Sequence, residues 1–251
     1  MSSAFGIRVH DSSGPALIYL PGLHGDWGLI GAFRRALNGR VRFVELSYPN
    51  SRMSLDALSV GVERALRDKG IESGWLLAQS FGSQVGWELL RRGFNADGVI
   101  LAGGFVRHPT PWGESLMRPL LDGPWSAAIR PPYRAMTWLG SALSGRDPDS
   151  ARELAAFAAG RSVAQWRAAA WRLRLVAESD PRQTARATLI PVWYLGGAID
   201  LLVPWPWVVR WLERECPGYR GKTIIARADH NVLGTAPKES AESVLGWLAA
   251  P

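Results

Sequence analysis

One stretch, residues 75–87, constrains the fold of this chain more than any other. An apolar run at its start predicts a buried strand, and apolar side chains at helical spacing follow over 83–92. Ser80 lies between the two, and the residues two positions before and after it, Ala78 and Gly82, are both small. The pattern predicts a sharp strand-to-helix turn with Ser80 at its apex, which has no space for larger neighbours. The simpler alternative is an ordinary turn in which a serine caps the helix.

Apolar runs and amphipathic segments alternate along most of the chain. Short apolar runs predict strands over 16–20, 41–46, 75–78, 99–102, 191–195 and 223–226. Segments with apolar residues at helical spacing predict helices over 29–37, 55–66, 83–92, 205–215 and 237–248. This alternation is typical of an α/β fold, in which helices connect the strands of a mostly parallel sheet.

The alternation stops in the middle of the chain. Residues 107–186 contain no convincing strand, their first part is rich in proline, and two helices are predicted over 151–159 and 163–177. We therefore predict one sheet-containing core, made of residues 1–106 and 187–251. A helical cap, residues 107–186, is inserted between two strands of that sheet.

The composition excludes several classes of protein. The chain has 251 residues, of which 47% are hydrophobic, and no apolar stretch is long enough to span a membrane. Cys216 is the only cysteine, so an internal disulfide is excluded, and a reducing, cytoplasmic location is the simplest expectation. No signal-peptide order, metal-ligand spacing, phosphate loop or complete dinucleotide fingerprint is present. We therefore expect neither a metal nor another cofactor.

The basic charge of the chain is concentrated in the predicted cap. The whole chain carries +7, and residues 107–186 contribute +5, from twelve arginines and seven acidic residues. The sequence has no lysine or arginine run, zinc-finger spacing or RNA-binding aromatic motif, so we do not expect nucleic acid as a partner. A basic rim would attract an anionic substrate or an acidic carrier protein. The alternative is that these arginines only solvate exposed helices.

Polar residues follow three of the predicted strands, at the edge where ligands bind in open α/β sheets. Ser80, Asp200 and His230 each come shortly after a different strand. A serine hydroxyl becomes a good nucleophile only beside a base, and a histidine oriented by a carboxylate is such a base. Asp229 is a second carboxylate near His230, but adjacent side chains in an extended segment point apart. Asp200 is therefore the preferred partner.

The chain resembles an α/β-hydrolase with a helical cap over essentially its whole length. The segments that carry the resemblance match in order and position, and they are 20–23, 78–82, 196–204 and 229–230. The resemblance implies a mostly parallel, doubly wound α/β-hydrolase sheet. It also implies a catalytic triad with Ser80 as nucleophile, His230 as base and Asp200 as the carboxylate that orients the base.

The resemblance extends to an oxyanion hole, with three departures from the family pattern nearby. The implied donors are the backbone N–H groups of Leu23 and Phe81. Ala78 stands in the first glycine position of the turn, Pro21 where histidine is frequent, and Ser83 where a second glycine is frequent. None of these departures removes a catalytic atom, so they bear on the type of substrate more than on activity.

The implied function is that of a cofactor-independent serine hydrolase, which cleaves carboxylic esters of small molecules through an acyl-enzyme. Nine of the thirteen tryptophans fall within 112–211, which is typical of helix packing but also suggests a pocket for an apolar acyl or aromatic substrate. Candidate substrate-binding residues are His24, Trp112, Trp138 and Trp205. The alternatives are a thioesterase, an acyl-carrier-linked ester hydrolase, an acyltransferase, a carbon–carbon bond hydrolase and a ligand-binding protein without turnover.

Overall fold

The described part of the chain contains nearly all of the predicted core and the end of the predicted cap. A computed structural model describes residues 5–107, 157 and 160–249. The predicted helix over 151–159 lies outside the described residues except for Phe157, which is helical. The candidate pocket residues Trp112 and Trp138 also lie outside the described residues.

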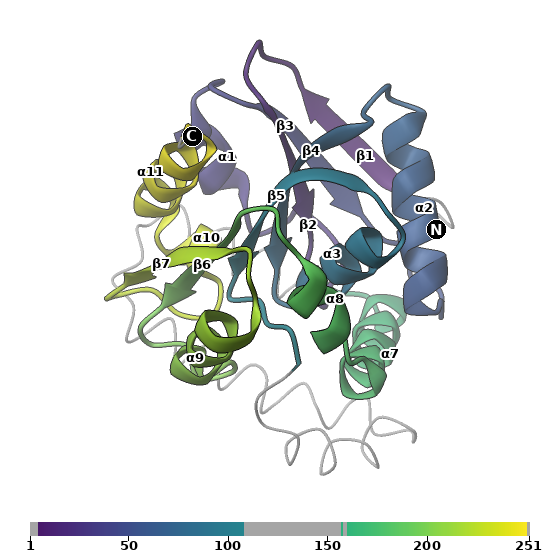
Figure 1. Cartoon of the computed structure of the whole chain (residues 1–251). Coiled ribbons are helices and arrows are strands. Elements are labelled where there is room, and N and C mark those ends of the chain that lie inside the picture. The colour runs from purple at the N-terminus through teal and green to yellow at the C-terminus, as the bar shows by residue number, and fades with distance from the viewer. Residues whose placement is uncertain (1–4, 108–156, 158–159, 250–251) are drawn as a thin grey trace.

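The centre of the molecule is a seven-stranded sheet (Figure 1). Its strands are β1 (Gly6–His10), β2 (Ala16–Leu20), β3 (Arg42–Ser47), β4 (Ser73–Gln79), β5 (Asn95–Ala102), β6 (Val192–Gly197) and β7 (Tyr219–Ile225). The strand order is β1-β3-β2-β4-β5-β6-β7, and all neighbouring pairs except β1 and β3 are parallel. The predicted mostly parallel sheet is thereby confirmed. β5 and β6 are neighbours although residues 103–191 separate them, so the middle of the chain is inserted between adjacent strands.

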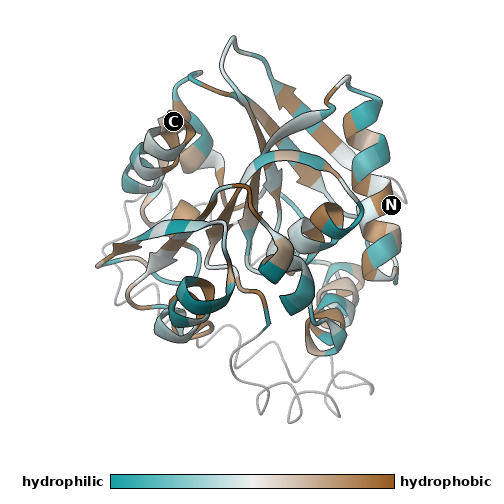
Figure 2. Ribbon diagram, in the orientation of Figure 1, coloured by the Kyte–Doolittle hydropathy of each residue, from teal (hydrophilic) through white to brown (hydrophobic). Residues whose placement is uncertain are grey.

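Helices cover both faces of the sheet. They are α1 (Gly31–Leu37), α2 (Leu55–Arg67), α3 (Gly82–Arg91), α7 (Val163–Glu178), α8 (Arg182–Ala187), α9 (Trp205–Glu215), α10 (Val232–Thr235) and α11 (Pro237–Leu248). One hydrophobic cluster contains residues of α2, α3, α7, α8 and α9, and a second contains residues of α1, α10 and α11. Figure 2 shows hydrophobic residues along the central strands and hydrophilic residues on parts of the helices. Among the described helices, none is both long and apolar enough to cross a membrane.

Three elements differ from the expectations drawn from the sequence. The edge strand β1 was not predicted, because its five residues are short and only one of its faces packs on the protein. It is defined by antiparallel pairing with β3, in which Gly6 lies opposite Ser47 and His10 opposite Phe43. The short helices α8 and α10 have six and four residues, too few to show a helical repeat in the sequence.

The strand-to-helix turn at Ser80 has the predicted sharp geometry. Ser80 has a φ of 51°, in the left-handed region that non-glycine residues rarely adopt. Its backbone N–H donates to the Ala102 carbonyl at the end of β5, and the Ser83 hydroxyl donates to the Ser80 carbonyl at 2.7 Å. The same hydroxyl accepts from the backbone N–H of Phe105 at 3.1 Å. Ser83 therefore ties the turn to the segment that follows β5.

The glycine two residues after Ser80 is required by close backbone approach. A Cβ atom at Gly82 would lie 2.1 Å from the Leu20 carbonyl oxygen at the end of β2. A Cβ atom at Gly86, one helical turn later, would lie 3.5 Å from the side chains of Ala78 and Leu20, which is ordinary van der Waals contact. The start of α3 can thus approach β2 only because residue 82 lacks a side chain.

This difference predicts that alanine destabilises the protein much more at one of these two positions than at the other. We expect Gly82→Ala to lower the free energy of unfolding by about 2 kcal/mol or more, because backbone atoms must move to admit the methyl group. Gly86→Ala is the matched control and should change it by no more than about 1 kcal/mol, since alanine favours a helix and its methyl group fits there. Urea unfolding of both variants checks this expectation, and equal destabilisation would contradict the packing argument.

Candidate active site

Three side chains from separate strand ends meet above the sheet. Ser80 follows β4, Asp200 follows β6 and His230 follows β7. His230 Nε2 lies 2.8 Å from Ser80 Oγ, and His230 Nδ1 lies 2.8 Å from Asp200 Oδ2. An ionised carboxylate only accepts hydrogen bonds, so Nδ1 carries the proton in the neutral ring and Nε2 accepts from the serine hydroxyl. The structure thus brings together the three residues that the sequence singled out.

The carboxylate of Asp200 is held by more than the imidazole. Its Oδ1 accepts hydrogen bonds from the backbone N–H groups of Leu202 at 2.9 Å and Val203 at 2.8 Å. The side chain is completely buried, so these donors satisfy its Oδ1 and set its orientation. Asp229 differs, because its Oδ1 accepts from the backbone N–H of Asn231 and from the Thr235 hydroxyl. That carboxylate organises the start of α10.

The charge of Asp200 changes the acid–base behaviour of His230. Burial by itself lowers the pKa of the imidazole, but the charge of Asp200 and its hydrogen bond raise it by more. The net effect is a pKa of His230 above its ordinary value of about 6.5. Such a ring is a stronger base than free imidazole and becomes protonated at a higher pH.

The two predicted oxyanion donors belong to residues close to Ser80. Phe81 directly precedes α3, and Leu23 belongs to the loop after β2, whose residues line the cavity beside Ser80. Within the described part of the chain, neither N–H donates a hydrogen bond to another protein group. The loop itself is held by a bond from the N–H of Gly25 to the carbonyl of Gly22 at 2.9 Å. Both predicted donors therefore stay available for a ligand.

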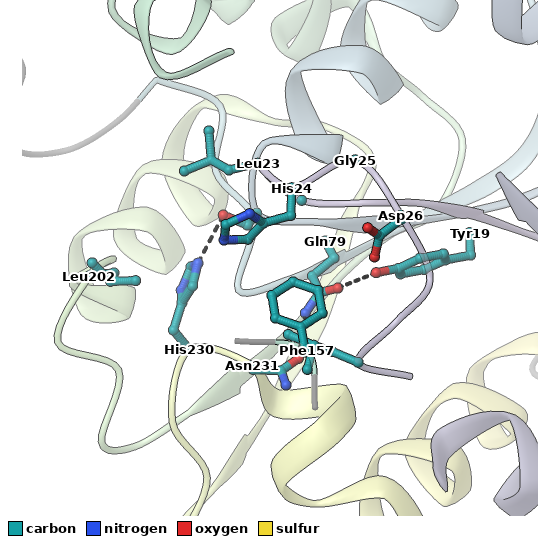
Figure 3. A pocket seen from close by; sticks show the side chains of 13 residues that line it. Tyr19, Leu23, His24, Gly25, Asp26, Gln79, Phe157, Leu202, His230 and Asn231 are labelled. Carbon is teal, nitrogen blue, oxygen red and sulfur yellow. Dashed lines mark hydrogen bonds between the residues drawn. The ribbon is translucent and has the colours of Figure 1, made fainter. Parts of the chain in front are cut away.

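A cavity of about 90 Å³ opens beside Ser80 (Figure 3). His230 and Leu202 lie towards one end of it in this view, and Tyr19 and Asp26 towards the other. Its wall contains a chain of hydrogen bonds, in which the Tyr19 hydroxyl donates to Gln79 Oε1 and Gln79 Nε2 donates to Asn231 Oδ1 at 2.7 Å. This chain links the residue before Ser80 to the residue after His230.

His24, a substrate-binding candidate from the sequence, lines this cavity. Its ring packs edge-on against Phe157, with centroids 5.0 Å apart, and against Trp166, with centroids 5.3 Å apart. Burial, and then the charge of Arg161, lower the pKa of His24 to about 4, so the ring is neutral at neutral pH. Nearby, Arg161 forms a bidentate ion pair with Asp26.

The remaining substrate-binding candidate occupies a different place. Trp205 is the first residue of α9, and its half-buried side chain packs against the hydrophobic cluster under that helix. It is not among the described residues that line the cavity.

Sequence reasoning missed several side chains of the cavity, among them Tyr19, Asp26, Gln79 and Asn231. A signal was present for two of them, since Gln79 and Asn231 directly adjoin the proposed nucleophile and base. Tyr19 lies in a strand whose residues are all apolar or aromatic, and only the structure shows that its hydroxyl reaches Gln79. In the described ranges, no group of three or more histidine, cysteine or acidic side chains is placed to hold a metal ion.

Most arginines of the described part of the cap are engaged with carboxylates. Arg107 and residues 157–186 carry the whole excess charge of the predicted cap, with seven arginines and two acidic residues. The ion pairs are Arg107–Asp180, Arg161–Asp26, Arg174–Glu178, Arg182–Asp180 and Arg186–Glu215. A further arginine, Arg172, is buried. Five of these seven arginines are thus paired, and two of the five share Asp180.

Several solved structures are similar to this chain over nearly its whole length. An enol-lactonase from Burkholderia xenovorans LB400 shares 16% identity with a TM-score of 0.80, over 98% of this chain and 96% of its own. An esterase from Exiguobacterium antarcticum shares 13% identity with a TM-score of 0.77, over 98% of this chain and 96% of its own. The esterase RhEst1 from Rhodococcus sp. ECU1013 shares 19% identity with a TM-score of 0.75, over 98% of this chain and 94% of its own.

The comparisons by sequence give no match, since no protein-family model and no curated protein matches the chain. The likeness is therefore one of structure, and it covers nearly the whole chain, with its mostly parallel sheet and flanking helices. The chain has the α/β-hydrolase fold.

Proposed function

We propose that this protein is a cofactor-independent serine hydrolase that cleaves carboxylic esters. The observation that carries the proposal is the unbroken chain of hydrogen bonds from Asp200 through His230 to Ser80, with 2.8 Å at both steps. A ligand-binding protein without turnover has no need for this chain, nor for a serine held in a strained backbone conformation. Esterases and an enol-lactonase among the similar structures support an ester substrate.

The geometry defines the role of each group. Ser80 Oγ attacks the ester carbonyl while His230 Nε2 takes its proton, and Asp200 stabilises the imidazolium that forms. The negative charge on the carbonyl oxygen is stabilised by the N–H groups of Leu23 and Phe81. His230 then gives the proton to the departing alcohol, which leaves the acyl group on Ser80. Water, activated by His230, releases the acid and restores the serine.

The cavity beside Ser80 supports a substrate that is mainly apolar near the reacting bond. Leu23, Leu29, Phe157 and Leu202 contribute apolar surface to it. A panel of esters graded by acyl chain length, with the matching thioesters, separates an esterase from a thioesterase. A β-diketone substrate, assayed for the products of carbon–carbon bond cleavage, tests the alternative of a carbon–carbon bond hydrolase.

The assignment of the nucleophile predicts the outcome of one substitution. Ser80→Ala should abolish covalent labelling by a fluorophosphonate and lower kcat by at least about 10⁴-fold, with no loss of folding. Ser243→Ala is the matched control and should retain both properties, because this half-buried serine of α11 donates to the Glu239 carbonyl of its own helix. Near-native turnover by Ser80→Ala would show that another residue is the nucleophile.

The two carboxylates near His230 should respond differently to the same change. We expect Asp200→Asn to lower kcat by about 10³-fold to 10⁴-fold, because the amide stabilises the wrong tautomer of the imidazole. Asp229→Asn should lower kcat by less than about 10-fold, since that carboxylate supports α10. The reverse ranking would assign the triad carboxylate to Asp229.

The raised pKa of His230 predicts where activity is lost on the acidic side of the pH profile. The base must be neutral, so kcat/KM should fall as the pH drops through the pKa of His230, with a midpoint above about 6.5. In Asp200→Asn the main cause that raises this pKa is removed, so the midpoint of the residual activity should shift to lower pH. A midpoint that stays in place would show that Asp200 does not control the base.

The expectation of an anionic substrate or acidic carrier protein is tested by ionic strength. Electrostatic steering would make kcat/KM of an anionic ester fall steeply between 0.01 and 0.1 M salt, where the Debye length drops from about 30 Å to about 10 Å. Because most described cap arginines are paired, we expect anionic and neutral esters of equal length to give parallel profiles. A steep fall for the anionic ester alone would instead support an acidic partner.

A further inference from the structure

Arg172 is the most deeply buried charged side chain described in the cap. It lies on α7 and is 1% exposed. Its Nη1 donates to the carbonyl of Leu23 at 2.8 Å and its Nη2 to the carbonyl of Pro49 at 2.7 Å. Burial lowers its pKa to about 10, so the guanidinium is still charged at neutral pH. In the described ranges no carboxylate forms an ion pair with it, so both hydrogen bonds go to backbone carbonyls.

A buried cation without a carboxylate partner is unfavourable for stability alone. Taking the charge out of water is costly, and an apolar side chain of similar size fills such a site at lower cost. The two accepting carbonyls belong to different loops, one after β2 and the other after β3. The planar guanidinium can donate to both at once, whereas the single ammonium of a lysine has no such fork. Arg172 therefore joins the inserted segment to two loops of the core.

The acceptor in the first loop is the central peptide of a tight turn. Gly22 to Gly25 form this turn, closed by the bond from the Gly25 N–H to the Gly22 carbonyl. The carbonyl of Leu23 points out of its centre to Arg172, and the N–H of the same residue is a proposed oxyanion donor. The N–H of Leu23 belongs to the preceding peptide, and the carbonyl of that peptide, on Gly22, accepts the bond that closes the turn. Hydrogen bonds therefore hold the peptides on both sides of the Leu23 Cα atom, which fixes the place of its N–H.

The surroundings of the turn fit closely around the guanidinium. Gly25 has a φ of 72°, and a Cβ atom there would lie 2.5 Å from Nη1 of Arg172. The carbonyl of Gly25 accepts from the backbone N–H of Tyr48, next to the Pro49 carbonyl that Arg172 also binds. The turn is thus held at its end by the loop after β3 and at its centre by Arg172.

We propose that Arg172 is a positioning residue, which holds the Gly22–Gly25 turn in the conformation that directs the Leu23 N–H at the substrate oxyanion. This inference rests on the proposed serine hydrolase function. Arg172 does not touch the substrate. It places one of the two donors that stabilise the tetrahedral intermediate, and it makes that donor dependent on the seating of α7 against the core.

The test compares Arg172→Lys and Arg172→Met with Arg174→Met in the full-length protein. Arg174 lies on the same helix and pairs with Glu178 at the surface, so its substitution is the matched control. A fluorophosphonate titrates the active sites, so kcat is given per reactive serine at a temperature well below each Tm. The substrate is a neutral ester, and a trifluoromethyl ketone that adds to the serine serves as the oxyanion mimic.

We expect both Arg172 variants to lower kcat by about 10-fold to 100-fold, somewhat less than full loss of an oxyanion donor. KM should change by less than about 3-fold. The ketone should bind more weakly by a factor close to the fold loss in kcat. The midpoint of the acidic limb of the pH profile should stay in place. If Arg172→Met does not fold, Arg172→Lys decides, because it retains the charge and the aliphatic stem.

The opposing results are distinct. A lower Tm with unchanged kcat and ketone affinity would show that Arg172 only stabilises the fold, and would overturn the inference. A rise in KM with kcat preserved would also overturn it. Absence of ester turnover and of serine labelling in the unsubstituted protein would overturn the proposed function itself, and the inference with it.

Discussion

The left-handed backbone at Ser80 is the constraint on which the rest of the site depends. A φ of 51° in a non-glycine residue costs on the order of 1 kcal/mol, which contacts on both sides must offset. The bond to the Ala102 carbonyl and the two bonds of the Ser83 hydroxyl supply those contacts. Because Gly82 lets α3 start against β2, the serine stands at a helix N-terminus, where developing negative charge is favoured.

Around this strained residue, the sheet arranges the other groups with little freedom. Parallel strands end at one edge, so the loops after β4, β6 and β7 meet there although they are far apart along the chain. Two backbone N–H groups hold Asp200, Asp200 holds His230, and His230 reaches Ser80. Each bond restricts the next side chain, so the base is oriented before a substrate arrives.

The described part of the inserted segment contacts the loop beside the site through two arginines. Arg161 pairs with Asp26 and Arg172 binds the carbonyl of Leu23, so both contact the loop that contains the proposed oxyanion donor. In the described part of the cap, Arg161, Arg172 and Arg186 contact the core, and three further arginines pair with carboxylates of the cap itself. Composition shows the number of arginines, but only the fold shows which of them are buried or paired.

The sequence by itself determined the six parallel strands, the turn at Ser80 and the three residues that meet above the sheet, because these depend on local periodicity and on the chain order of motifs. Tertiary structure alone decided the edge strand β1, which exists only by pairing with β3. It also decided the contacts of Gln79 with Asn231 and of Arg172 with Leu23. These contacts join residues about 150 positions apart, and long-range proximity leaves no periodic signal in a single sequence.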